Sequence, residues 1–180
     1  MYKLEEIDRR VKLLRRGQRV LDLGAFPGSW TLYAAGKVGR EGHVLGIDLQ
    51  EHAGALPDNA EMRTADVSTV TAAELGTFDV VLSDMAPSTM GVRDVDQWRS
   101  YQLFIRALEI AEQVLVPGGT FVGKIFQGAE FLEAKRAVQR VFELARVIKP
   151  EASRKESYEI FLLGLGRRPI TAAATEPTRS

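Results

Sequence analysis

The chain has 180 residues, of which 45% are apolar and 27% charged, and its formal net charge is zero. This composition is that of an ordinary globular protein, and the length fits one domain with a sizeable core. The absence of cysteine excludes disulfides and cysteine-ligated zinc, and the presence of only two histidines argues against any metal site.

The first predicted element is a helix over residues 4–15, where Leu4, Ile7, Val11 and Leu14 recur at helical spacing. This segment is charged and lacks the apolar core of a secretory signal. No run in the chain approaches the ~18 apolar residues of a membrane span. We therefore expect a cytoplasmic protein.

Strands and helices then alternate along the chain. Apolar runs predict strands over residues 19–24, 43–49, 62–66, 78–84, 120–126, 145–149 and 158–165. Helical spacing predicts helices near 29–38, 71–75, 96–115 and 129–142, the third of which should stop at Pro117-Gly118-Gly119. Alternation with apolar strands predicts an α/β fold, in which a doubly wound, mostly parallel, seven-stranded sheet has helices on both faces.

This pattern predicts a single domain over residues 1–168, whose residues 1–18 form a basic N-terminal helix, and a disordered tail over 169–180. Residues 1–19 hold seven Lys and Arg against three acids, and residues 135–155 hold seven against two. The two basic segments are either solvated helix faces or parts of one surface that binds a polyanion.

Unusual polar residues follow the strands of the predicted sheet. In a doubly wound sheet, ligands bind beyond the carboxyl ends of the strands, near the switch point. Gly24–Gly28 follow the first predicted strand, and Asp48, Asp66, Asp84 and Lys124 lie at the ends of the next four. We therefore expect one site at this rim of the sheet.

The segment DLGAFPGSW (residues 22–30) reads as a strand-to-helix turn. Its glycines, Gly24 and Gly28, let the backbone approach a ligand, although the motif lacks the third glycine of a dinucleotide site. Asp48 is spaced to accept hydrogen bonds from ribose hydroxyls, and Asp66 could accept one from an exocyclic amine. These positions favour a nucleoside-containing cofactor over a nicotinamide dinucleotide, and over a tight turn with no ligand.

Lys124 lies within the apolar run TFVGKIFQG (residues 120–128). An ammonium that is buried without a partner costs several kcal/mol, so a lysine in such a strand needs a reason. Either its ammonium reaches solvent at the strand end, or it serves the site at the rim.

Four segments in this order, DLGAFPGSW, SDMAPSTMG, PGGTFVGKIFQG and SRKESYEIFLLG, resemble the FtsJ/RrmJ family of S-adenosylmethionine-dependent RNA ribose 2′-O-methyltransferases. The resemblance covers roughly residues 2–166. It implies a Rossmann-like methyltransferase fold, S-adenosylmethionine as cofactor and RNA as partner. The expected target is a uridine of large-subunit (23S) ribosomal RNA, with no obligate protein partner. The alternatives are another RNA (transfer RNA or an mRNA cap) and a non-catalytic RNA- or nucleoside-binding module.

The resemblance also assigns site residues. It carries a Lys-Asp-Lys-Glu tetrad onto Lys3, Asp84, Lys124 and Glu159, with Glu156 as the alternative fourth member. Lys124 would contact the reacting oxygen, either as a general base or as a cation that stabilises the developing alkoxide. Asp84 would orient Lys124, and Glu159 would position Lys3 or the ribose.

The family's cofactor contacts carry onto five residues of this sequence. They are Gly28, Trp30, Asp48, Asp66 and Asp84. Trp30 would either touch the cofactor or pack beneath the loop that holds it.

Overall fold

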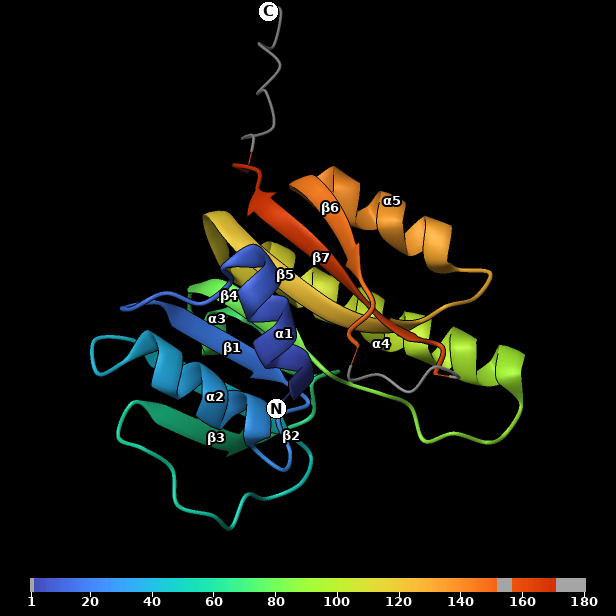
Figure 1. The fold of residues 1–180 in the computed structure, drawn as a ribbon. Helices are drawn as coiled ribbons and strands as arrows, with labels where there is room; N and C mark the ends of the chain where they lie inside the picture. The colour runs from blue at the N-terminus through green and yellow to red at the C-terminus, as the bar shows by residue number, and fades with distance from the viewer. Residues whose placement is uncertain (1, 152–156, 171–180) are drawn as a thin grey trace, which may run out of the picture.

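In the computed structural model, which describes residues 2–151 and 157–170, seven strands form one sheet in the order β3-β2-β1-β4-β5-β7-β6 (Figure 1). The strands are β1 (Arg19–Leu23), β2 (His43–Asp48), β3 (Ala60–Thr64), β4 (Phe78–Ser83), β5 (Leu115–Phe126), β6 (Phe142–Ile148) and β7 (Glu159–Arg167). Strands β1 to β5 pair in parallel, and β7 runs antiparallel between β5 and β6. The predicted α/β fold with a mostly parallel sheet is confirmed.

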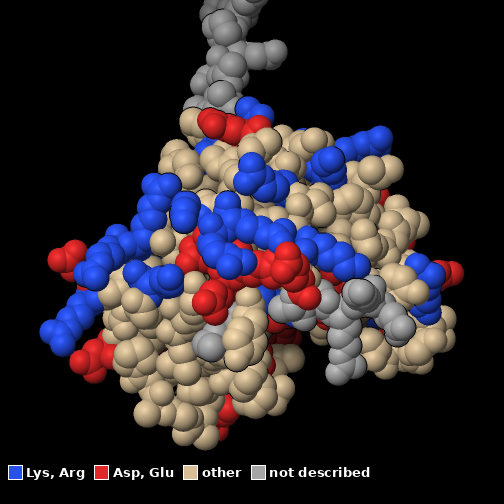
Figure 2. All heavy atoms as spheres, viewed as in Figure 1, with Lys and Arg blue, Asp and Glu red and all other residues tan. Residues whose placement is uncertain are grey.

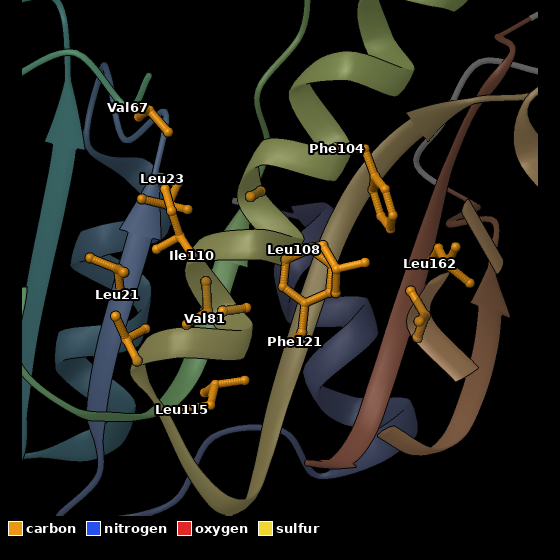
Figure 3. Close-up of a cluster of buried hydrophobic side chains, with 14 of the residues drawn as sticks. Leu21, Leu23, Val67, Val81, Phe104, Leu108, Ile110, Leu115, Phe121 and Leu162 are labelled. Atoms are coloured by element: carbon orange, nitrogen blue, oxygen red, sulfur yellow. The ribbon is translucent and has the colours of Figure 1, made fainter. Parts of the chain in front are cut away.

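Helices cover both faces of this sheet. Helices α1 (Tyr2–Val11) and α2 (Ser29–Val38) pack on one face, and α3 (Ala72–Leu75), α4 (Arg93–Val114) and α5 (Phe131–Val141) pack on the other. Figure 3 shows the core under α4, where Phe104 meets Phe121 edge-on with ring centroids 5.5 Å apart. Each fully buried ring of this kind contributes roughly 2–3 kcal/mol to folding, so this layer holds the sheet rigid.

Helix α1 ends at Val11, four residues before the end that its apolar spacing predicts. The carboxylate of Asp8 accepts a hydrogen bond from the backbone N–H of Leu14 at 2.9 Å and another from the Tyr33 hydroxyl at 2.9 Å. The bond to Leu14 holds the chain that follows α1 against the helix, and the bond to Tyr33 joins α1 to α2. Leu13 and Leu14 are therefore buried from a turn rather than from a helix.

The segment Pro117-Gly118-Gly119 was predicted to stop the preceding helix, but it lies inside β5, and α4 ends earlier, at Val114. Pairing with β4 shifts at this point, because Phe78 lies opposite Leu115 whereas Val80 lies opposite Thr120. Proline has no N–H to donate, and Gly118 has a φ of 81°, which glycine adopts without strain. The segment thus bulges out of the strand.

The remaining elements lie where they were predicted, with boundaries that differ by at most three residues. From residue 171 on, the predicted tail lies outside the described residues. No helix within residues 2–151 and 157–170 combines the length and apolarity that crossing a membrane requires.

The register of the sheet brings the ends of four strands to one level. Leu23 pairs with both Ile47 and Ser83, and Ser83 pairs with Gly123. The residues that come next are Gly24, Asp48, Asp84 and Lys124. Because β7 is antiparallel, its first residue, Glu159, begins at this same rim. The expected convergence of polar residues is therefore built into the pairing.

Candidate active site

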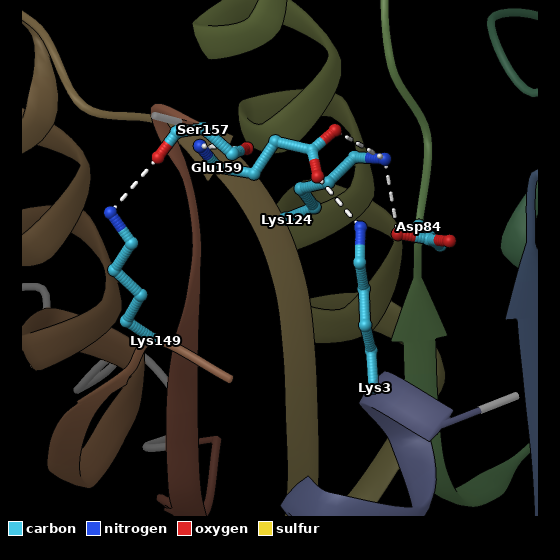
Figure 4. Close-up of polar contacts among 6 residues, drawn as sticks. All are labelled: Lys3, Asp84, Lys124, Lys149, Ser157 and Glu159. Carbon is cyan, nitrogen blue, oxygen red and sulfur yellow. Dashed lines mark hydrogen bonds and ion pairs between the residues drawn. The ribbon is translucent and has the colours of Figure 1, made fainter. Parts of the chain in front are cut away.

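Four charged side chains meet at the rim (Figure 4). Lys124 Nζ lies 3.1 Å from Asp84 Oδ1 and 3.6 Å from Glu159 Oε1. Lys3 Nζ donates a hydrogen bond to Glu159 Oε2 at 2.7 Å. The structure thus brings together the four residues that the resemblance assigns to a tetrad, from α1, β5, β7 and the end of β4. Glu156, the alternative member, lies outside the described residues.

The side chain of Lys124 is only 7% exposed, so its ammonium is withdrawn from bulk water. Its cross-strand neighbour is Phe161, which is fully buried in the core beneath α1 and α2. Removal of an ammonium from water is costly unless it is paired. Asp84 and Glu159 supply two carboxylates, which compensates for the burial and fixes the position of Nζ.

The surroundings of Glu159 favour the ionised form of its carboxyl group. Burial opposes its ionisation, but the hydrogen bond from Lys3 and the positive charges of Lys124 and Lys3 outweigh that effect. The pKa of Glu159 is therefore lowered below its ordinary value. The carboxylate bridges the two lysines as a fixed negative charge.

Asp84 belongs to the tetrad and is also one of the residues that line a neighbouring cavity. Its Oδ1 atom is buried, and although Lys124 Nζ lies 3.1 Å away, that contact lacks the angle of a hydrogen bond. Among the described residues, Oδ1 therefore accepts no hydrogen bond.

The cavity measures about 890 Å³ and lies beyond the ends of β1, β2 and β4. Its wall includes Gly24, Asp48, Asp66, Asp84, Arg99 and Gln102. Asp48 is held by the backbone N–H groups of Phe26 and Gln50, at 3.0 and 2.9 Å. The backbone N–H of Ser68 donates to Asp66 at 2.8 Å, which lowers the pKa of that carboxyl.

This cavity fits the cofactor that the resemblance implies. Its volume is in the range of small-molecule sites. Carboxylates at Asp48 and Asp66 offer acceptors to hydroxyl and amino groups, and together with Asp84 they suit a cationic ligand. A Cβ at Gly24, where φ is 75°, would come within 2.5 Å of Met85 Cγ, so glycine is what allows Met85 to pack closely against this part of the wall.

Two predicted cofactor contacts, Trp30 and Gly28, are not among the residues that line the cavity. Trp30 is 4% exposed and packs against Phe161, with ring centroids 5.7 Å apart. Of the two roles considered for Trp30, the geometry supports packing beneath the loop. Gly28 faces the ring of His52, and a Cβ there would lie 3.1 Å from His52 Cε1.

Sequence reasoning missed Asp22 and His52. Asp22 is fully buried, its Oδ2 accepts a hydrogen bond from Thr31 Oγ1 at 2.7 Å, and its Oδ1 has no partner among the described residues. Burial raises the pKa of Asp22 to about 7, and the negative charges of Asp84 and Asp48 act in the same direction. An acid inside the apolar run RVLDLG was the available signal. Nothing in the sequence indicated that His52 would cover Gly28.

A basic surface adjoins the tetrad (Figure 2). The backbone N–H of Glu151, just past β6, donates a hydrogen bond to Glu6 Oε2 of α1 at 2.9 Å, so the chain after β6 lies against α1. We call the exposed basic residues of these segments the basic band: Arg9, Arg10, Lys12, Arg15, Arg16 and Lys149. If the two basic segments formed one surface, the basic residues of α5 would contribute to it, but α5 packs on the opposite face of the sheet from α1.

Over residues 1–167 the chain matches the FtsJ-like methyltransferase family. It is 51% identical over 171 residues to the ribosomal RNA large subunit methyltransferase E of Sorangium cellulosum, covering 93% of this chain and 81% of that protein. Its identity to the protein of the same name from Syntrophobacter fumaroxidans is 50% over 173 residues, covering 93% and 88%.

Solved structures share the fold. A Plasmodium falciparum chain assigned as a ribosomal RNA methyltransferase matches with a TM-score of 0.79 at 24% identity, over 92% of this chain and 95% of that one. Human methyltransferase-like protein 13, solved in complex with SAH, matches with a TM-score of 0.65 at 16% identity, over 97% and 86%. The fold is thus Rossmann-like and is shared with methyltransferases.

Proposed function

The chain belongs to the FtsJ-like methyltransferase family, and on that basis we propose that it transfers a methyl group from S-adenosylmethionine to a ribose 2′-hydroxyl of RNA, at a uridine of large-subunit ribosomal RNA. The observation that carries this proposal is the buried Lys124 ammonium, paired with Glu159 and with Asp84, which also lines a nucleoside-sized cavity. A cofactor site and a charged catalytic cluster therefore share one residue, Asp84.

The cavity would hold the cofactor through its acids. Asp48 is suited to ribose hydroxyls and Asp66 to an exocyclic amine, and Gly24, which also lines the cavity, lets Met85 pack into the wall beside them. S-adenosylmethionine, when bound, supplies an electrophilic methyl group on a sulfonium. The negatively charged rim would favour that cation.

The tetrad would align the attacking hydroxyl. The Lys124 ammonium, fixed by two carboxylates, is placed to hold the 2′-oxygen and to stabilise negative charge that develops on it. Glu159 bridges the two lysines, because one of its carboxylate oxygens contacts Lys3 and the other contacts Lys124. We assign Lys124 the cationic role rather than that of a general base, because its ammonium is already paired in the folded protein.

The proton of the hydroxyl needs an acceptor. The proton leaves the oxygen as the C–O bond forms and the C–S bond breaks, and the Lys124 ammonium favours the deprotonated oxygen, so that a nearby carboxylate can accept the proton. Asp84 Oδ1 accepts no hydrogen bond from the described residues and lies beside both the cavity and Lys124. We assign it this acceptor role.

The RNA would lie along the basic band. Lysine and arginine side chains bind phosphates and release counterions, which supplies affinity without sequence preference. Ribosomal RNA is favoured over transfer RNA or an mRNA cap because the relatives above are named for the large ribosomal subunit. Without that name, the geometry would fit any RNA.

The experiment is transfer of labelled methyl groups to separated RNA fractions from cells that lack this protein. We expect label in large-subunit ribosomal RNA, in a dinucleotide that alkali does not cleave, because a 2′-O-methyl group blocks hydrolysis. Label confined to transfer RNA or to mRNA caps would show that this RNA, and not large-subunit ribosomal RNA, is the substrate. Cofactor binding without transfer to any RNA would indicate a silent binding module.

A further inference from the structure

An arginine and a tyrosine stack on each other next to the tetrad. The guanidinium carbon of Arg93, the first residue of α4, lies 4.2 Å from the ring centroid of Tyr158. Tyr158 immediately precedes Glu159, and its carbonyl accepts a hydrogen bond from the backbone N–H of Gln127 at 2.8 Å. That bond extends the β5–β7 ladder and fixes the tyrosine at the rim.

Both side chains are exposed, and the tyrosine ring remains 49% accessible. An exposed cation–π pair adds little to the stability of a fold. Its effect is instead to hold two flat groups in one orientation before any ligand arrives. Bases of single-stranded RNA bind to such surfaces by stacking on aromatic rings and on guanidinium planes.

We propose that the Arg93–Tyr158 pair is a platform for an unpaired nucleobase that flanks the nucleotide to be methylated. The proposal rests on the RNA methylation proposed above and adds a substrate-positioning site to it. Successive side chains of a strand point to opposite faces, so Tyr158 projects away from the face on which Glu159 holds Lys3. A base on this platform therefore belongs to a neighbour of the target nucleotide.

The alternative role for Arg93 is to bind a phosphate. Its next neighbour along the chain, Asp94, is an exposed acid in the first turn of α4, and a second acid, Asp96, follows. Negative charge at this helix end disfavours a phosphate and leaves stacking unaffected. The local charge thus favours a base over the RNA backbone.

The test measures methyl transfer to large ribosomal subunits from cells lacking the protein, at varied subunit concentration. We expect Tyr158→Ala to raise KM for the subunit roughly tenfold, and Tyr158→Phe to stay within about twofold of wild type. Arg93→Lys keeps the positive charge but loses the planar guanidinium, so its KM should lie between those of Tyr158→Ala and Tyr158→Phe. The matched control is Trp98→Ala, an equally exposed aromatic residue of α4 that stacks on Tyr101 instead.

Two further readouts separate stacking from other effects. A single-stranded oligonucleotide that contains 2-aminopurine should lose fluorescence on binding wild type and Tyr158→Phe, but not Tyr158→Ala. The dependence of RNA affinity on salt should be the same for wild type and Tyr158→Ala, because the tyrosine neutralises no phosphate. Affinity for S-adenosylmethionine, measured by calorimetry, should be unchanged in all variants.

The proposed platform is contradicted if Tyr158→Ala has the same KM and the same fluorescence quenching as wild type. It is also contradicted if Trp98→Ala raises KM and reduces quenching as much as Tyr158→Ala does. A shallower salt dependence in Tyr158→Ala would also overturn it. Failure of the wild-type protein to methylate RNA would instead contradict the proposed function, and the quenching comparison would still decide the platform.

Discussion

Asp22 and Lys124 are both charged residues inside apolar strands, and the fold accommodates them differently. Lys124 has two carboxylate partners, whereas Asp22 has one hydroxyl, that of Thr31, and an oxygen with no partner among the described residues. Burial therefore raises the pKa of Asp22 to about 7. Asp22 is therefore about half protonated near pH 7.

This raised pKa predicts a pH-dependent stability. The folded protein retains a proton that the unfolded chain releases near 3.8, so the free energy of unfolding should fall as pH rises from about 4 to about 7. Asp22→Asn stays neutral and should exceed wild type in stability at pH 8 by a few kcal/mol, at roughly 1.4 kcal/mol per pKa unit. The difference should vanish at pH 4.

Unfolding in urea at pH 4, 6 and 8 measures both proteins. Asp58→Asn, which changes an exposed acid, is the control and should follow wild type. Parallel pH curves for wild type and Asp22→Asn would show that the carboxyl is ionised in the fold.

At the scale of single residues, the sequence shows which residues lie at the ends of strands or inside apolar runs. It does not show which way a side chain points once the elements pack together. Lys124 was identifiable because a charge in an apolar strand needs a partner, whereas Glu159 was assigned only through the resemblance to the FtsJ/RrmJ family. The placements of Trp30 and His52 were not identifiable, because the direction of a side chain near a turn depends on the opposing surface. Trp30 meets Phe161 from β7, far away in sequence.

At the scale of elements, α1 decides whether the tetrad is complete, because it carries Lys3. The helix is anchored by Asp8, which is buried and accepts hydrogen bonds from Leu14 and Tyr33, with Lys37 Nζ 3.6 Å away. The contacts of one carboxylate therefore couple the orientation of α1 to the position of the Lys3 ammonium.

We expect Asp8→Ala to lower the free energy of unfolding by about 2–4 kcal/mol, because it leaves a buried N–H, a hydroxyl and an ammonium without their acceptor. Methyl transfer should fall more than cofactor affinity, since Lys3 is displaced while the cavity is intact. Tyr33→Phe removes one of the bonds and should lose only about 1 kcal/mol. Thermal unfolding and calorimetry with S-adenosylmethionine check both variants. Equal stability of Asp8→Ala and wild type would exclude the anchor.

Element types were predictable, and two ends were not. The pattern of apolar residues specified the strands and helices, but α1 stops short because Asp8 captures Leu14, a side-chain bond that periodicity does not report. The Pro117-Gly118-Gly119 segment reads as a helix stop, yet it lies in a bulge of β5 whose position depends on the partner strand. The first difference arises from a side-chain bond between residues six apart, and the second from pairing with a strand elsewhere in the sequence.

At the scale of the whole molecule, alternation of strands and helices predicted the parallel sheet and its functional rim. It did not reveal that β7 inserts antiparallel between β5 and β6, which is what returns Glu159 to that rim. Charge counts along the chain identified two basic segments. Only the fold shows that α1 and the chain after β6 share a face, while α5 lies on the other.

This arrangement predicts where RNA binds. Replacement of Lys12 and Arg15 by alanine should weaken RNA binding and make its dependence on salt shallower, by about 0.7 in log–log slope for each phosphate that is no longer neutralised. The same change at Arg136 and Arg140 of α5 removes equal charge from the opposite face and should leave both quantities near wild type. Binding titrations at several salt concentrations make the comparison. Equal effects of the two double substitutions would mean that net charge, and not the basic band, governs affinity.

The central claim is that an ammonium in the middle of the sheet contacts the sugar oxygen that receives the methyl group. The direct measurement is the single-turnover rate of methyl transfer by Lys124→Met, which keeps the length of the side chain and removes its charge. We predict a rate at least about a thousandfold below wild type, with S-adenosylmethionine affinity within about twofold, and partial recovery in Lys124→Arg, which restores a cation that cannot act as a base. A Lys124→Met protein that binds the cofactor and transfers methyl groups at a near wild-type rate would contradict the account.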